Sequence, residues 1–199
     1  LRQFPPTKER TMSMIVVDVS MSLDGFISGP NVRAEEPMGE GGEGLHTWMA
    51  AAETDPAVAR ELVTGVGASL VGRHTFELGL RPWGGTPWPG TPSFVVTHRP
   101  RPDLPGDNGG TFAFDGLAAA VSRATQAAGK GDVFVLGGEL THHLLRAGLL
   151  DEIRLHIVPI LLGGGTPLFA GELAELDPIH ESVAGSVTHL HLRVAGHQP

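Results

Sequence analysis

Apolar and polar residues alternate over residues 15–23, IVVDVSMSL, near the start of the chain. Every odd position in this segment is apolar, and three of the four even positions carry Asp or Ser. A period of two is typical of a β-strand that buries one face. The segment therefore predicts a strand, and the Asp24-Gly25 pair that follows it predicts a turn.

Beyond residue 44, short apolar runs alternate with amphipathic segments. The expected helices are residues 45–52, 55–63, 75–80, 115–129 and 139–148, and the expected strands are residues 68–72, 93–97, 111–114, 132–138 and 152–161. Residues 179–194 predict a hairpin that closes the chain. This order is typical of an α/β sandwich with a mostly parallel central sheet and a C-terminal antiparallel hairpin.

Length and composition favour one domain with one sizeable core, because the chain has 199 residues, 41% hydrophobic residues and a mean hydropathy of +0.04. We expect residues 1–13 to be a disordered leader or an expression remnant, followed by a single domain over residues 14–199. No apolar stretch reaches the roughly 18 residues of a membrane span. No signal peptide is visible, so we expect a cytoplasmic protein with no membrane partner.

Charge and missing residue types restrict the chemistry. The net charge is −8 and the chain has no basic cluster, which argues against a nucleic-acid partner. The absence of Cys and Tyr excludes disulfides, thiolate nucleophiles, zinc–thiolate sites and a tyrosine proton donor. Lys8 and Lys130 are the only lysines, and neither position suits Schiff-base catalysis.

Residues 39–44, GEGGEG, match the glycine spacing of a dinucleotide-binding loop, but no strand precedes them. That motif needs a strand before it and a helix after it, and Glu40 and Glu43 would repel a phosphate. We interpret residues 29–44 as a flap over an active site, with a plain surface loop as the alternative.

A second glycine pair, Gly137-Gly138, directly links a predicted strand to a predicted helix. Without side chains the backbone N–H groups can approach a phosphate, and the helix N-terminus adds partial positive charge. The pair thus indicates an anion site, with a simple tight turn as the alternative.

Two other strand ends carry Thr, His and Arg. Gly72 is followed by Arg73, His74 and Thr75, and residues 97–99 are Thr, His and Arg. Arginine is a fixed cation with several donors, and a threonine hydroxyl can cap the helix that follows. Because open α/β sheets bind ligands beyond the carboxyl ends of their strands, these sites together predict a dinucleotide, and the second arginine suits the 2′-phosphate of NADP.

Four segments in this order resemble the dihydrofolate reductase superfamily: MSLDGFI, VGRHTFE, VFVLGG and LLDEIRLHIVPILLGGGTPLF. They are most similar to the branch that contains the reductase domain of bacterial riboflavin biosynthesis, over residues 14–194. The resemblance implies a dihydrofolate reductase-like three-layer fold, NADPH as hydride donor and a homodimer.

The same resemblance implies which residues contact the cofactor. These are Gly72, Arg73, His74 and Thr75 at the adenosine-side phosphates, Thr97, His98 and Arg99 around the 2′-phosphate, Gly137, Gly138, Glu139 and Leu140 along the pyrophosphate, and Val19, Ile27, Gly164 and Thr166 around the nicotinamide.

Two departures from the family concern the substrate. Phe26 stands where relatives that reduce a ribosylaminopyrimidine phosphate have a lysine, so a phosphorylated sugar loses an anchor. The helix-borne carboxylate that protonates dihydrofolate, beside a Trp-Asn-Leu-Pro run, is not found either. Its region offers only Glu53 and Asp55, and Asp55 is expected to cap a helix.

Asp24 and His46 are the candidates for polar groups that face the substrate. The alternatives are that Asp24 only fixes its turn and that His46 lies on the surface or caps a helix. Trp48, Trp83 and Trp88 would form an aromatic wall for a flat substrate or, equally, pack in the core.

The remaining histidines come in two pairs. His189 and His191 share one face of a strand, as metal ligands do, but no third ligand is near and a polar outer face explains them equally well, so we expect no metal. His142 and His143 are consecutive on a predicted helix, so at least one should be exposed.

The leading hypothesis is an NADPH-dependent oxidoreductase that transfers a hydride to a small planar or heterocyclic substrate, such as a pterin, pyrimidine, flavin or quinone. The alternative is a nucleotide-binding protein on the same fold that has no turnover and acts as a sensor or partner subunit.

Overall fold

A sheet of nine strands forms the centre of the part of the chain that this computed structural model describes, residues 13–52 and 64–196. In spatial order its strands are β10 (Leu176–Ala184), β11 (Val187–Val194), β8 (Glu152–Val158), β1 (Ile15–Ser22), β7 (Asp132–Leu136), β3 (Val66–Gly72), β4 (Ser93–Val96), β6 (Thr111–Asp115) and β5 (Leu104–Pro105). Neighbours from β8 to β6 are parallel, whereas the β10–β11 hairpin and β5 join antiparallel. A separate two-stranded ribbon pairs β2 (Phe26–Ser28) with β9 (Thr166–Pro167).

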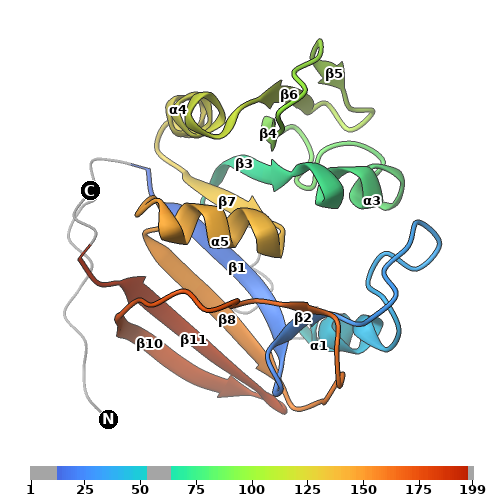
Figure 1. Cartoon of the computed structure of the whole chain (residues 1–199), viewed down its shortest axis with the longest axis vertical. Coiled ribbons are helices and arrows are strands. Elements are labelled where there is room, and N and C mark those ends of the chain that lie inside the picture. The colour runs from blue at the N-terminus through green and yellow to red at the C-terminus, as the bar shows by residue number, and fades with distance from the viewer. Residues whose placement is uncertain (1–12, 53–63, 197–199) are drawn as a thin grey trace.

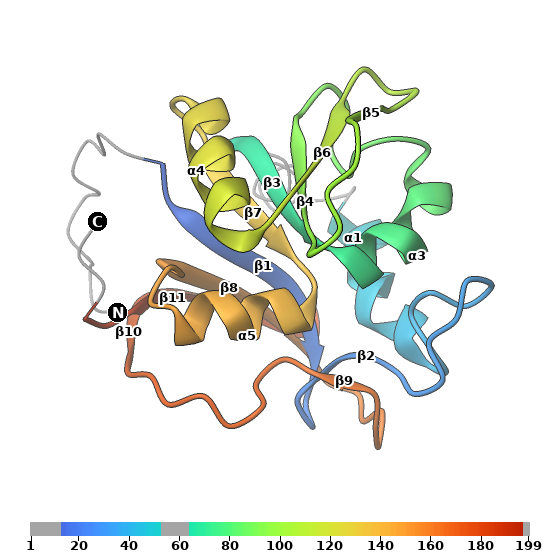
Figure 2. The same ribbon diagram turned by 45° about the horizontal axis from the view of Figure 1, so that its top comes forward.

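Helices cover both faces of this sheet, as Figures 1 and 2 show. The helical elements are η1 (Gly42–His46), α1 (Thr47–Ala52), α3 (Arg73–Trp83), α4 (Leu117–Ala128) and α5 (Gly138–Arg146). We call face A the side that α4 and α5 cover, and face B the side that carries η1, α1 and α3. None of the helices in the described ranges is both long and apolar enough to cross a membrane.

The main hydrophobic core lies on face A. Odd residues of β1, including Val17, pack there with Leu70 of β3 and Val135 of β7. Alanines on one side of α4 and Leu144 of α5 pack against these strand residues and complete the core. The period-two prediction is thereby confirmed for odd positions 15 to 21, which face the core, whereas Leu23 lies beyond the end of β1 and is exposed.

Face B is apolar only in parts. Phe76 of α3 packs edge-on against Phe112 and Phe114 of β6, with ring centroids 4.9 and 5.3 Å apart. Leu45 of η1 and Trp48 of α1 pack near Val158 of β8. Between these two clusters, the side chains of Asp18 and Ser20 of β1, His156 of β8 and His189 of β11 are polar.

The predicted order of strands and helices is confirmed over the described residues, including the mostly parallel sheet and the closing hairpin. The predicted helix at 55–63 lies outside these residues. One predicted cap is wrong: α4 begins after Gly116 with no side-chain cap, and Asp115 is the last residue of β6. Its carboxylate instead accepts a hydrogen bond from Arg123, at 2.5 Å.

Candidate active site

Two helix N-termini meet at the carboxyl edge of the sheet. α3 begins directly after β3, with Gly72 as its N-cap, and α5 begins directly after β7, with Gly137 as its N-cap. Because β3 and β7 are parallel neighbours, the two helix starts lie side by side. A Cβ added to Gly137 would lie 2.6 Å from the Thr75 hydroxyl oxygen and 3.8 Å from the Gly72 nitrogen. The chain thus brings Gly72, Thr75 and Gly137 together, as the sequence predicted.

Glycine is required at this meeting point. Gly137 has φ +113°, a conformation that other residues rarely adopt. Neither helix has a side-chain cap in the described part of the chain. The prediction that Thr75 caps α3 is therefore wrong, because Thr75 is the third helical residue and its hydroxyl faces Gly137 instead. Free first-turn N–H groups at two adjacent helix starts suit an anion.

The end of β4 lies beside this pair, since Val96 pairs with Gly72 in register. Thr97 is buried, and its hydroxyl accepts a hydrogen bond of 3.1 Å from the backbone N–H of Arg99. This turn presents His98 and Arg99 to solvent. Residues 97–99 therefore extend the same edge of the sheet as Arg73 and His74, which are also exposed.

Arg73 already has a partner on its own helix. Its guanidinium lies 2.8 Å from the carboxylate of Glu77, one turn along α3, and both side chains are more than half exposed. Exposed pairs of this kind contribute little to stability, so the guanidinium is available for a stronger anionic partner.

Gly138 at the start of α5 forms the next part of the site. A Cβ at this position would lie 3.1 Å from the Ile27 side chain of β2 and 3.1 Å from the Thr166 side chain of β9. The Thr166 hydroxyl accepts a hydrogen bond of 2.8 Å from Ser28. The structure therefore brings Gly138, which the resemblance placed along the pyrophosphate, next to Ile27 and Thr166, which it placed around the nicotinamide.

The other residues expected along the cofactor take up different surroundings. Leu140 is buried in the face A core, so only its backbone can reach a ligand, whereas Glu139 is exposed in the first turn of α5. Val19 packs against the same core as Leu140. Gly164 lies in the loop before β9, and nothing occupies the space where its Cβ would be.

Asp24 holds the loop between β8 and β9. Its carboxylate accepts hydrogen bonds from the backbone N–H groups of Leu162, at 3.1 Å, and Gly163, at 2.7 Å. The Ser22 hydroxyl and then these N–H groups lower the pKa of Asp24 below its ordinary value. An ionised carboxylate with these partners suits loop fixation, and its catalytic role stays a prediction.

His46 ends η1 and is partly buried. Burial lowers the pKa of this imidazole, and the carboxylate of Glu43 only partly opposes the effect. At neutral pH the ring is therefore uncharged and has no extra proton to donate. The role of His46 as a group that faces the substrate stays a prediction.

The three tryptophans belong to different clusters and do not form one wall. Trp48 packs with Leu45, Trp83 with Phe76, and Trp88 against Phe134 with ring centroids 5.5 Å apart. Among the histidine pairs, His143 is exposed, as predicted, while His142 contacts the Leu168 carbonyl at 2.8 Å.

Sequence reasoning missed two features. Arg101 lies over the ring of Phe114, 4.1 Å from its centroid, just beyond residues 97–99. The sequence feature that could have revealed it is a third basic residue in the segment that contains His98 and Arg99. Asp18 and His156 form a contact of 2.9 Å on face B, and their signal was a charged residue and a histidine in the middle of two apolar strands.

The fold is similar to those of several solved structures. A putative riboflavin biosynthesis protein from Shewanella sp. PV-4 is 22% identical with a TM-score of 0.64, and the match covers 91% of this chain and 98% of that one. Dihydrofolate reductase from Enterococcus faecalis, solved with NADP(H), is 15% identical with a TM-score of 0.58 and covers 92% and 96% of the two chains. The fold therefore defines an α/β protein of the dihydrofolate reductase-like class.

Within this class the family is also shown. The model of the RibD C-terminal domain matches residues 13–196, so the chain belongs to that family. The uncharacterized protein YyaP of Bacillus subtilis is 28% identical over 171 residues, which are 78% of this chain and 79% of YyaP. The resemblance inferred from the sequence motifs is confirmed.

Proposed function

We propose that this protein is an NADPH-dependent reductase of a small planar or heterocyclic substrate. The family and the reductases among its structural relatives support an oxidoreductase. The observation that carries the proposal is the pair of glycine-capped helix starts, α3 and α5, which meet where Gly137 approaches Thr75. Backbone N–H groups of both helices would hold the pyrophosphate there.

The edge of β1 that extends beyond β7 is where we place the nicotinamide ring in this proposal. β1 pairs with β7 only from Ile15 to Val17, whereas it pairs with β8 as far as Ser22. In the described part of the chain, β1 therefore has no strand neighbour on the β7 side beyond this point. This edge lies next to the start of α5, at the carboxyl end of a parallel sheet, where such sheets bind ligands. When bound, NADPH would supply a hydride to the substrate.

Exposed arginine and histidine side chains are the reason why we expect NADPH to bind more tightly than NADH. Arg99 and His98 would bind the 2′-phosphate, and Arg73 and His74 the phosphates on the adenosine side. Arg101 adds a further cation close to Phe114. The substrate is not expected to carry a sugar phosphate, because Phe26 is half-buried in β2 where a lysine would be needed. The homodimer implied by the family resemblance stays a prediction.

Calorimetry with NADPH and NADH tests this proposal. Arg99→Ala should weaken NADPH binding about 10-fold or more, the scale of a charge-assisted hydrogen bond, and leave NADH binding nearly unchanged. Arg81→Ala is a matched control, because Arg81 is exposed at the other end of α3. Equal losses for both dinucleotides would place Arg99 away from the 2′-phosphate, and absence of binding would refute the proposal. Tight binding without turnover of any pterin, flavin or quinone would favour the non-catalytic alternative.

A further inference from the structure

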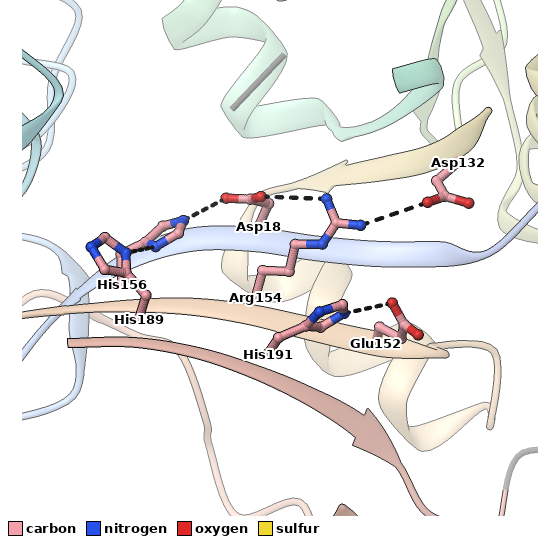
Figure 3. A network of polar contacts seen from close by, with 7 residues as sticks. All are labelled: Asp18, Asp132, Glu152, Arg154, His156, His189 and His191. Carbon is pink, nitrogen blue, oxygen red and sulfur yellow. Dashed lines mark hydrogen bonds and ion pairs between the residues drawn. The ribbon is translucent and has the colours of Figure 1, made fainter. Parts of the chain in front are cut away.

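A chain of polar contacts crosses face B from β1 to β11 (Figure 3). Nε2 of His156 lies 2.9 Å from Oδ1 of Asp18, and Nδ1 of His156 lies 2.7 Å from Nδ1 of His189. The indole N–H of Trp48 donates to the Ser20 hydroxyl at 3.0 Å, and the Trp48 ring lies 4.7 Å from that of His156. These contacts fix the imidazole of His156 between a carboxylate and a second imidazole.

The contacts limit where protons can be. Two ring nitrogens 2.7 Å apart can share only one proton, so one of the two imidazoles donates and the other accepts. An ionised Asp18 requires a proton on Nε2 of His156. One further proton then gives an imidazolium that donates to both Asp18 and His189. The group can therefore store one proton next to the carboxylate.

Asp18 and His156 are nearly buried, with 13% and 11% of their side-chain surfaces exposed. A charge on a central strand is unfavourable unless it is paired, and the apolar alternation of β1 gives no packing reason for Asp18. Strongly paired acid–base groups in such a position are candidates for a functional role.

Asp18 also lies where β1 loses its neighbour. It follows Val17, the last residue of β1 that pairs with β7, and its side chain lies on face B. This is the edge that the proposed function assigns to the nicotinamide. A substrate stacked on that ring from face B would have Asp18 and Ser20 beside it.

We propose that Asp18 is the proton donor to the substrate and that His156 is the positioning residue that supplies its proton. This inference rests on the proposed function. As a hydride adds to the carbon of a C=N or C=O bond, the heteroatom takes a proton from Asp18, and Nε2 of His156 passes its proton to the carboxylate. His156 is left neutral and regains a proton from water, so that the substrate gains one hydride and one proton in all.

Other charged side chains lie around Asp18 and His156 within the described residues. From β8, the Arg154 guanidinium lies 4.0 Å from Asp18 and 3.7 Å from Asp132 of β7. From β11, His191 contacts Glu152 at 2.7 Å, and Arg193 lies 3.9 Å from the same carboxylate. Trp48 is the neutral group of α1 that covers His156. Asp18 thus lies beside a guanidinium and an imidazole, of which only the imidazole can exchange a proton with the carboxylate.

Binding of the two cofactor forms tests the proposal without any acceptor. The nicotinamide of NADP⁺ is positively charged and that of NADPH is neutral, while the phosphates are the same. When the pair loses its proton it becomes more negative, which favours the cationic ring. The ratio of Kd for NADP⁺ to Kd for NADPH should therefore fall about 3- to 10-fold between roughly pH 5 and pH 8, the effect of one unit charge several ångströms from the ring. The proposed phosphate contacts of His74 and His98 are the same for both dinucleotides, so their contribution cancels in this ratio.

The variants are Asp18→Asn and His156→Gln, with His143→Gln as control because His143 is exposed at the end of α5. Calorimetry should show a ratio independent of pH in folded His156→Gln and an unchanged pH dependence in the control. In folded Asp18→Asn the ratio at pH 8 should rise about 3- to 10-fold above the wild-type value, because one negative charge beside the ring is lost. A flat ratio in the wild type, a pH dependence that persists in His156→Gln, or an Asp18→Asn ratio equal to that of the wild type at pH 8 overturns this inference while NADPH still binds. If neither dinucleotide binds the wild type, the proposed function fails, and this inference with it. Circular dichroism identifies a variant that does not fold, and the other variant then decides.

Discussion

At the scale of single residues, Glu77 controls how freely Arg73 can reach a ligand. The guanidinium lies 2.8 Å from this carboxylate on an exposed helix face. Glu77→Gln removes the competing charge, so NADPH should bind about 2- to 5-fold more tightly, in keeping with the small energy of exposed pairs. Calorimetry at low and high ionic strength measures the gain, which salt should reduce. Glu181→Gln, on the distant strand β10, should have no such effect, and an equal gain there would point to overall charge instead.

Asp24 is expected to fix its loop through ionised contacts. Its folded-state pKa is lowered, so its stabilisation of the loop is present above the unfolded-state pKa of about 4 and is lost as the pH falls through the lower folded value. Asp24→Asn removes this charge at every pH. The amides of Leu162 and Gly163, which donate to Asp24, should then exchange with deuterium about 10-fold faster at neutral pH. Unchanged exchange at both amides would show that the loop needs no help from Asp24.

At the scale of elements, the turn from β7 into α5 decides whether the two helix starts can meet. Gly137→Ala forces a side chain into φ +113°, and the new Cβ would meet the Thr75 hydroxyl at 2.6 Å. We expect a loss of about 2 kcal/mol in the free energy of unfolding together with weaker NADPH binding. Urea denaturation measures the first and calorimetry the second.

Gly116→Ala is the matched control for this turn. Gly116 also precedes a helix, but it has φ −68° and open space around its Cβ position. Alanine there should lower the free energy of unfolding by less, since it adds no strain. Losses of similar size in both variants would mean that Gly137 serves only as a helix cap.

Local patterns predicted elements well where one physical cause dominates. Alternation placed β1 correctly, and Gly137-Gly138 marked the start of α5, because buried faces and positive φ angles leave direct traces in the sequence. The cap of α4 was mispredicted because Asp115 had a competing partner, Arg123, eight positions away. The sequence could not decide whether Trp48, Trp83 and Trp88 form an aromatic wall or pack in the core. Only the folded sheet places them in three separate clusters.

Contacts between distant strands could not be predicted in this way. Asp18 and His156 are 138 positions apart, and their contact depends on β8 lying next to β1. That neighbourhood follows from the crossover through α5, which carries the chain from β7 over β1 to β8. The sequence showed polar residues on both strands, but not that they share a face.

At the scale of the whole molecule, sheet order gathers cations at one edge of an acidic protein. The net charge is −8, yet the ends of β3 and β4 place Arg73, His74, His98 and Arg99 beside two helix N-termini. A local field of this kind can bind an anionic ligand against an unfavourable net charge, because screening limits distant charges to about 10 Å.

A ligand held by several elements should stabilise the whole fold. The proposed site joins β3, β4, β7 and both helix starts, so NADPH should bind the native state and not the unfolded chain. At a concentration 100 times Kd, this adds about 2.7 kcal/mol, which for a chain of this size corresponds to a rise in Tm of roughly 5 to 10 °C. Differential scanning calorimetry measures the shift. NADH at the same concentration should raise Tm less, and Arg73→Ala should reduce the NADPH shift by several degrees. An equal rise with both dinucleotides would contradict the assignment of Arg99 and His98 to the 2′-phosphate.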